Sequence, residues 1–134
     1  MLKPNGSLGM IWNNPDRSVS WIKCMMEMLD VRFKRRNMPH PDIKDWHLKI
    51  KQHGGFAPLN ICEHSYKYNM ELDLGGVLDL YNSFSIVSSA ESAEKEEILS
   101  EVVNEMKTNP ELKDSEVHTY SFASKIEWVQ KLDS

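Results

Sequence analysis

Polar and aromatic residues gather near the start of the chain, where Trp12, Asn13, Asn14 and Asp16 lie within five positions. An indole ring offers an apolar wall, and amide and carboxylate groups offer hydrogen bonds, so these residue types suit recognition of a small molecule. Tyr81 could supply a second aromatic wall. The alternative, equally open, is that Trp12 fills the core and the asparagines form an Asx turn. No residue of the chain can be assigned as a general base.

Cysteine and histidine residues form the second group of candidates. Cys62 and His64 are two positions apart, so both lie on one side of an extended strand, and His118 joins them if the last strand pairs alongside. No second Cys-x-x-Cys or His-x-x-x-His pair completes a ligand set, and neither Cys24 nor Cys62 has a partner histidine at a catalytic spacing. We therefore expect no metal site, and we expect both thiols to be buried in apolar surroundings.

A turn and a strand must position the first group. Pro4, Asn5 and Gly6 favour a turn, because proline presets φ and an Asn-Gly pair tolerates positive φ. The nearly continuous apolar run over residues 7–12 predicts a strand covered on both faces in a parallel sheet. Ligands of open α/β sheets bind at the carboxyl ends of the strands. The polar loop at residues 13–16 is therefore the predicted substrate-binding edge.

Two amphipathic helices are expected next. The first should be capped by Asp16 or Ser18, and the second should begin after Asp42 and end at Gly54 and Gly55. Apolar residues three and four positions apart define the inner faces. They are Val19, Ile22, Met25, Met26, Leu29 and Phe33 in the first helix, and Ile43, Trp46 and Ile50 in the second.

The second half of the chain predicts two strands separated by helices. Residues 59–68 and 117–129 read as strands, Asp73 is the expected cap of one intervening helix, and residues 88–91 form a capping-box pattern for another. The apolar residues of these elements are Val77, Leu78, Tyr81, Phe84, Ile98, Leu99, Val102, Val103, Met106, Tyr120, Phe122 and Ile126.

Length and composition indicate one α/β domain. The 134 residues are 40% hydrophobic and 27% charged, which is typical of a globular protein. The net charge of −4 disfavours nucleic acid and anionic membranes as partners. Since neither a signal pattern nor a transmembrane run is visible, we expect a cytoplasmic protein. The expected division is strand, helix, helix and strand over 1–71, helices over 72–112, and a final strand over 113–134.

The opening stretch LKPNGSLGMIWNNPDRSVSW resembles a segment of class I S-adenosylmethionine-dependent methyltransferases, which runs from a turn through the fifth strand of the sheet. It is most similar to the branch often labelled methyltransferase type 11, where the strand ends in Trp-Asn and a polar segment follows. The matching positions are Leu2, Lys3, Pro4, Gly6, Trp12, Asn13, Asp16, Ser18, Val19 and Trp21.

The resemblance implies methyl transfer to a small-molecule acceptor, with S-adenosylmethionine as the cofactor of the full-length family. The family holds that cofactor with a Gly-rich loop after the first strand and an acidic residue that ends the second. This sequence has no such loop, and the pairs Gly54-Gly55 and Gly75-Gly76 stand in a different context. We therefore expect the carboxyl-terminal half of a methyltransferase, without cofactor-binding residues and inactive alone.

The fold implied is the carboxyl-terminal portion of a Rossmann-like sheet: its last three strands, with a helical insertion between the final two. Leu78, Tyr81, Asn82 and Phe84 of that insertion could close over the substrate edge as a lid. An alternative is a non-catalytic remnant or interaction module that pairs, even with itself, through an exposed sheet edge. A third is an unrelated small α/β binding domain.

Overall fold

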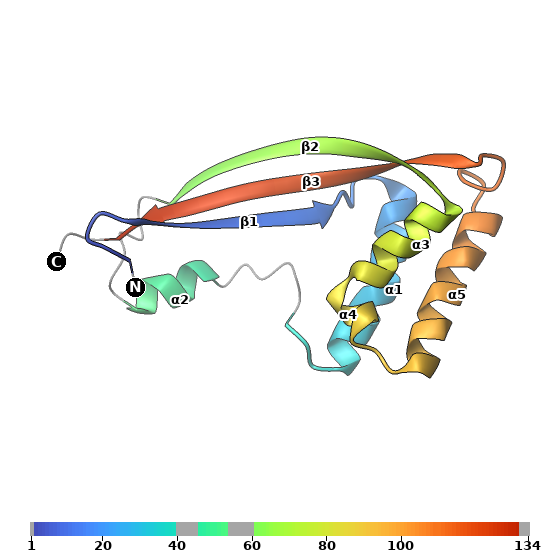
Figure 1. Ribbon diagram of the computed structural model, residues 1–134, viewed down its shortest axis with the longest axis horizontal. Helices are drawn as coiled ribbons and strands as arrows, with labels where there is room; N and C mark the ends of the chain where they lie inside the picture. Colours follow the sequence, from blue (N-terminus) through green and yellow to red (C-terminus); the bar gives the residue numbers. More distant parts are fainter. Residues whose placement is uncertain (1, 40–45, 54–60, 132–134) are drawn as a thin grey trace. The chain divides into compact units, whose positions relative to one another are not determined.

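The computed structural model describes residues 2–39, 46–53 and 61–131. Over these residues the chain forms three strands and five helices (Figure 1). Their bounds are β1 Ser7–Pro15, α1 Ser20–Arg35, α2 Trp46–His53, β2 Cys62–Asp73, α3 Leu74–Ser83, α4 Ser85–Ser88, α5 Ser92–Thr108 and β3 Val117–Gln130.

The strands form one sheet in the order β1-β3-β2, with the last strand in the middle (Figure 1). The backbone N–H of Asp16 donates to the carbonyl of Ser121, and that of Lys131 donates to Gly6, each at 2.8 Å. As the residue number rises along β1, the number of the paired residue on β3 falls, so the two strands are antiparallel. Since β2 is antiparallel to β3 as well, β1 and β2 run in the same direction on either side of it.

The prediction of a strand covered on both faces in a parallel sheet is wrong. β1 runs on to Pro15, its hydrogen-bonded neighbour is antiparallel, and its residues alternate between exposed and half-buried. Ile11 is 71% exposed. An apolar run shows that both faces of a strand are apolar, but what covers each face depends on elements distant in the sequence.

The chain divides into two compact units. We call residues 1–14, 41–68 and 122–134 the sheet unit, and residues 15–40 and 69–121 the helical unit. All three strands contribute residues to both units, β1 only through Pro15.

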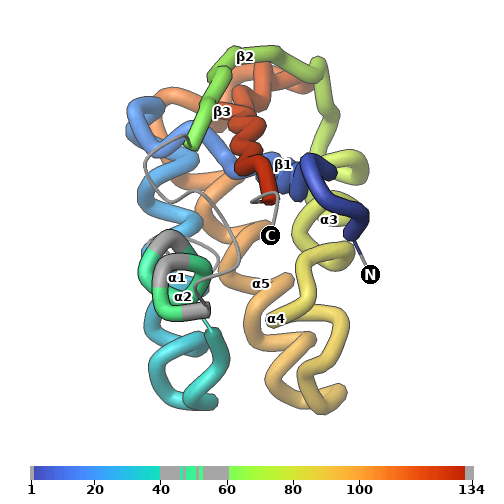
Figure 2. Tube along the Cα trace, turned by 90° about the vertical axis from the view of Figure 1, so that its left-hand side faces the viewer, coloured from blue at the N-terminus to red at the C-terminus, as the bar shows by residue number. Residues whose placement is uncertain are grey.

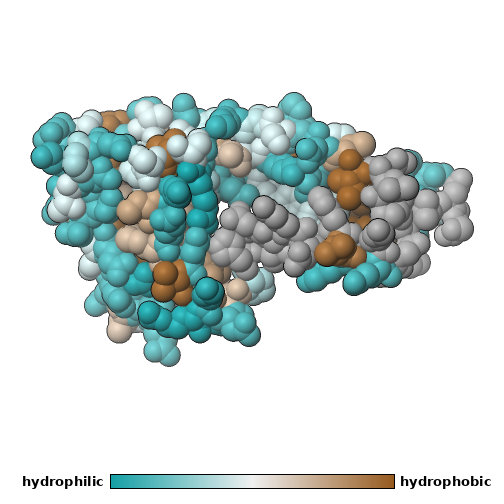
Figure 3. All heavy atoms as spheres, turned by 180° about the vertical axis from the view of Figure 1, so that it is seen from behind, coloured by the Kyte–Doolittle hydropathy of each residue, from teal (hydrophilic) through white to brown (hydrophobic). Residues whose placement is uncertain are grey.

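The helical unit has its own apolar core. The helices α1, α3, α4 and α5 contact one another, and Figure 2 shows them running alongside each other. The predicted stripes of α1, α3 and α5 point inward, because residues three and four apart share a helix face. Fully buried members are Ile22, Met25, Leu29, Val77, Tyr81, Ile98 and Val102. Seen from behind, the outer surface of these helices is mostly hydrophilic, with few apolar patches (Figure 3).

The apolar periodicity of the sequence did not predict that Arg32 lies on the buried side of α1. Its guanidinium donates to Glu101 at 2.9 and 3.1 Å and lies 3.3 Å from Glu97, both on α5. The hydrogen bond to Glu101 raises the pKa of Arg32. Only the carboxylate partners reach solvent, so this network ties α1 to α5 at the edge of the core.

Of the three predicted helix caps that fall on described residues, one is confirmed. The Asp73 carboxylate accepts a hydrogen bond of 2.7 Å from the Gly76 N–H at the start of α3. The other two predictions are wrong: the N-cap of α1 is Val19 and that of α5 is Glu91, and neither makes a side-chain cap bond. The side-chain type indicates which residues are able to cap a helix, but the residue at which the helix begins depends on how the folded chain packs.

The predicted strands shift in their bounds. β2 reaches Asp73, five residues past its predicted end, because it continues along β3, and β3 ends at Gln130. The short α4 was not anticipated. The expected cap at Asp42 and the stop at Gly54 and Gly55 lie outside the described residues.

Of the helices described, none has both the length and the apolar character needed to cross a membrane.

Candidate functional site

The carboxyl-terminal part of β1 separates its candidate residues onto two faces. Successive side chains of a strand point in opposite directions. Trp12 and Asn14 therefore share one face of the sheet unit, and Asn13 lies on the other. The structure brings the asparagines to one strand end, but it does not bring all three side chains into one site.

Asn13 belongs to a polar row that crosses all three strands. The Ser124 hydroxyl on β3 donates to Asn13 Oδ1, and Asn13 Nδ2 donates to the Tyr68 hydroxyl on β2, each at 2.7 Å. The two partners together fix the orientation of the amide. Tyr68 in turn stacks on Phe122, with ring centroids 4.9 Å apart. Asn13 is therefore held in a defined position on an exposed part of the sheet.

Trp12 contacts α2 on the opposite face. Its ring stacks on Trp46, with centroids 5.9 Å apart, and Trp46 Nε1 donates to Glu127 Oε2 at 2.8 Å. Glu127 is only 3% exposed, and its other oxygen lies 2.8 Å from the Lys125 ammonium. The hydrogen bonds that the Lys125 ammonium donates to Glu127 and, to a smaller extent, to Glu63 raise the pKa of Lys125. Trp12 thus packs against α2, beside the buried Glu127 carboxylate, whose charge is compensated by the Lys125 ammonium.

Asn14 lines a hollow of about 520 Å³ within the sheet unit. Hydroxyl, amide and ammonium groups dominate its polar lining, so the hollow offers mostly hydrogen-bond donors. Its lining residues are Asn14, Ser65, Tyr66, Lys67, Ala123, Ser124 and Lys125. Of the sequence-predicted residues in the sheet unit, Asn14 is the one that borders this hollow.

Asp16 lies in the helical unit and shapes the turn before α1. It is 7% exposed, and its Oδ1 accepts from the Ser18 N–H at 3.0 Å and from the Ser18 hydroxyl at 2.7 Å. This is an Asx-type turn made by Asp16, whereas the structural alternative drawn from the sequence assigned such a turn to the asparagines. The carboxylate stabilises the turn that precedes α1.

Tyr81 is fully buried in the core of the helical unit. Its hydroxyl is 3.1 Å from that of Tyr120, and the rings of Phe84 and Trp21 pack against this pair. Burial raises the pKa of both phenols, so both stay neutral at physiological pH. In this structure Tyr81 is a core residue, and its role as a wall of a substrate site stays a prediction.

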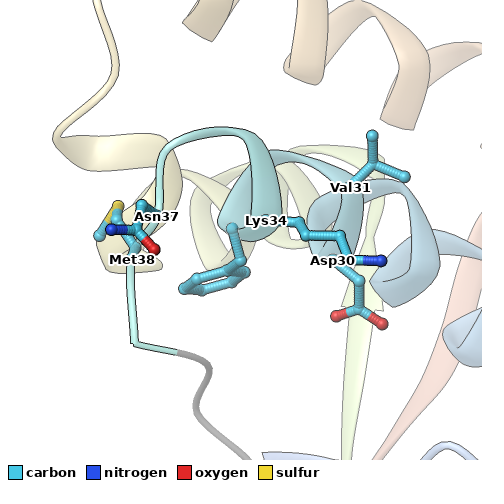
Figure 4. A pocket seen from close by; sticks show the side chains of 6 residues that line it. Asp30, Val31, Lys34, Asn37 and Met38 are labelled. Carbon is cyan, nitrogen blue, oxygen red and sulfur yellow. The ribbon is translucent and has the colours of Figure 1, made fainter.

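Two further hollows lie in the helical unit. One, of about 520 Å³, lies at the end of α1 and is lined by Asp30, Val31, Phe33, Lys34, Asn37 and Met38 (Figure 4). The other, of about 440 Å³, is lined by Asp73, Leu74, Gly75, Met106, Lys107, Lys113, Ser115, Glu116 and His118. None of the predicted substrate-binding residues lines either hollow.

The cysteine and histidine candidates do not form a ligand set in the described residues. His118 is buried against the edge of Trp21, whereas Cys62 and His64 are exposed on β2. Within the part of the chain that the structure describes, no three His, Cys, Asp or Glu side chains are grouped to hold a metal. The expectation of buried thiols is wrong, because Cys24 and Cys62 are both exposed. Apolar neighbours in the sequence do not reveal which face of an element a thiol occupies.

Sequence reasoning missed the partners that define this region. Asn13 is hydrogen-bonded to Tyr68 and Ser124, and Trp46 is hydrogen-bonded to Glu127. The two members of each pair are 55 to 111 residues apart in the sequence. Alternation along 117–129 could have placed Ser124 and Glu127 on opposite faces, but only the strand pairing shows which residues they meet.

Two relatives in Schizosaccharomyces pombe resemble this chain. One, described as the uncharacterized methyltransferase-like C25B8.10, is 30% identical over 132 residues, 95% of this chain and 50% of its own length. The other, described as the uncharacterized methyltransferase C25B8.09, is 32% identical over 112 residues, 82% of this chain and 41% of its own. The chain therefore spans about half the length of these relatives. No family model matches it. The chain is related to proteins named methyltransferases.

Proposed function

We propose that this chain is the substrate-side half of a class I S-adenosylmethionine-dependent methyltransferase that acts on a small molecule. The observation that carries the proposal is the 30% identity to a methyltransferase-like protein over 95% of the chain. The position of α3, α4 and α5 between β2 and β3 also agrees with it, because the resembled branch often carries a helical insertion between its last two strands.

The residues of this chain do not fit the cofactor. Its sulfonium is a cation, and the lining of the hollow beside Asn14 includes no Asp or Glu that could pair with it. The carboxylates nearest Lys125, those of Glu63 and Glu127, are already held in ion pairs with that lysine. The sequence also lacks a Gly-rich loop. We therefore place cofactor binding in the half of the enzyme that the relatives have beyond the matched segment.

The acceptor side of the reaction is the part that this chain can supply. In methyl transfer by direct displacement, the protein mainly positions the acceptor and excludes water. The donors beside Asn14 suit an acceptor molecule that carries oxygen atoms. Asn13, on the other face of β1, instead ties the three strands together through Ser124 and Tyr68. Trp12, Asp16 and Tyr81 then act by holding β1, the turn and the helical core in place.

Calorimetric titration with S-adenosylmethionine tests the proposal. The isolated chain should give no binding heat, whereas the chain co-purified with the unmatched segment of C25B8.10 should bind the cofactor. Asn14→Ala should keep cofactor binding in that complex and impair methylation of an acceptor. Binding by the isolated chain contradicts the claim that its residues form no cofactor site, and no binding by the complex counts against the methyltransferase assignment.

A second function is that of a non-catalytic module that pairs with another copy of the chain. It is favoured by β1, which among the strands that the structure describes pairs on one side only, with β3. In the β1–β3 ladder, the even-numbered positions 6 and 16 make the inter-strand bonds, so the N–H of Gly9 points to the free edge. Gly9→Pro should therefore dissociate such a dimer without breaking the ladder, while Gly9→Ala, whose Cβ meets nothing within 4 Å, should not. Light scattering reads the outcome; a monomeric wild-type chain eliminates this function.

A further inference from the structure

The strands of the sheet unit place their charges on one face. The odd-numbered residues of β2 and β3 in this unit include all four charged side chains, Glu63, Lys67, Lys125 and Glu127. This is also the face on which Trp46 of α2 contacts Glu127. We call the opposite face the open face: the odd-numbered residues 7–13 of β1 and the even-numbered residues 62–68 of β2 and 122–130 of β3.

The open face carries no Asp, Glu, Lys or Arg, yet the exposed large apolar side chains on the strands of the sheet unit all lie on it. Ile11 is 71% exposed, Tyr66 44% and Trp128 38%. A sheet face that meets water usually carries polar and charged residues, while its apolar residues face the core. Here the distribution is reversed, which is typical of a surface that another protein segment covers.

The aromatic residues of the open face form a continuous row. The rings of His64 and Tyr66 are stacked with centroids 6.4 Å apart, those of Tyr66 and Tyr68 6.3 Å apart, and Tyr68 continues onto Phe122. The planes of neighbouring rings are inclined to each other by only 15° to 27°, so the row presents a nearly flat aromatic surface. Such a surface suits burial against an apolar surface of another polypeptide.

The lengths of the relatives indicate what covers this face. The match to C25B8.10 takes up 50% of that protein, so about as many residues again lie outside the matched segment. We propose that the open face is the docking surface for the polypeptide that corresponds to this remaining half, which covers it with an uncharged, apolar face of its own. The inference rests on the proposed function, because it takes the chain as one half of a methyltransferase.

Cys62 provides a probe on the open face, and Cys24 provides a control within the same molecule. Pairing in the sheet places Cys62 across from Trp128, whereas Cys24 lies on α1 in the helical unit, and both thiols are exposed. The full chain is co-expressed with the unmatched segment of C25B8.10, and alkylation of each cysteine by iodoacetamide is timed by mass spectrometry. We expect a one-to-one complex in which Cys62 reacts at least about tenfold more slowly and Cys24 at an unchanged rate.

Two exposed apolar residues give matched variants. Ile11→Glu places a charge on the open face and should abolish the complex and the protection of Cys62. Val31→Glu, at a 57% exposed position on α1, should leave both unchanged. Both sites are exposed, so each variant should fold, which circular dichroism checks.

The docking proposal is overturned if the two polypeptides do not co-purify, or if Cys62 reacts equally fast in the complex. It is also overturned if the chain alone forms a dimer that protects Cys62, because a second copy is then the occupant. Titration with S-adenosylmethionine separates the two proposals. A complex in which Cys62 is protected but no cofactor binds supports docking and contradicts the methyltransferase assignment. A complex that binds the cofactor but leaves Cys62 unprotected supports the methyltransferase assignment and contradicts docking.

Discussion

The two units differ in where their apolar residues lie. Among the described residues, every buried hydrophobic side chain except Phe122 and Val129 belongs to the helical unit. The sheet unit instead exposes Ile11, Tyr66 and Trp128. Apolar burial is the main stabilising term of a fold. The helical unit therefore resembles a small domain with its own core, and the sheet unit resembles one side of an interface.

Truncation of the helical core should have the largest effect. Leu29→Ala removes a fully buried side chain of α1, and the lost burial and the cavity should lower the free energy of unfolding by about 3 kcal/mol. Ile11→Ala on the open face should cost less than about 1 kcal/mol. Urea denaturation of the isolated chain measures both. Equal losses would mean that Ile11 is buried in solution and would remove the contrast between the units.

The buried tyrosine pair allows a sharper test of the helical core. Tyr81→Phe removes the hydrogen bond between the two buried hydroxyls, which should cost about 2 kcal/mol. The double variant with Tyr120→Phe should recover part of that loss, because neither polar hydroxyl then remains in the core. A thermodynamic cycle over the wild type, both single variants and the double variant gives the coupling. Strictly additive losses would show that the two hydroxyls do not interact.

The same pair predicts instability at high pH. Burial raises the folded-state pKa of both phenols above their unfolded value of 10.0, so the unfolded chain loses these protons first. The contribution of the neutral phenols to the free energy of unfolding is fully present below pH 10, and it is lost as the pH rises through the folded-state pKa values. Denaturation at pH 9 and pH 11 should therefore show a drop that Tyr81→Phe with Tyr120→Phe reduces. A drop of the same size in that variant would assign the effect to other groups.

The smallest effect should come from the polar row of the sheet unit. Ser124→Ala removes the donor to Asn13 at a buried position, where a hydrogen bond contributes about 1 kcal/mol. Thr119→Ala, which removes an exposed bond to Glu71, should cost less and serves as the control. The comparison is measured by urea denaturation. If Ser124→Ala costs nothing, the row does not fix the Asn13 amide in solution.

Prediction from the sequence succeeded where the signal was periodic and local. The stripe of α1 from Ile22 to Phe33 and the cap at Asp73 follow from residues within one element, and the structure confirms both. The candidate site was less accessible. Trp12 was correctly placed near the end of β1, whereas Asn14, expected in the loop after it, belongs to the strand. Their neighbours Trp46 and Lys125 come from distant segments.

The sequence by itself determined the helical faces, the positions of the strands to within a few residues, and the similarity to methyltransferases. Local propensity and side-chain spacing contain that information. Only the tertiary structure decided that β3 lies between β1 and β2, that Tyr81 and Tyr120 share a buried bond, and that the charges of the sheet unit lie on one face. These features depend on strand register, which pairs residues far apart in the chain and exchanges the two faces with a shift of one residue.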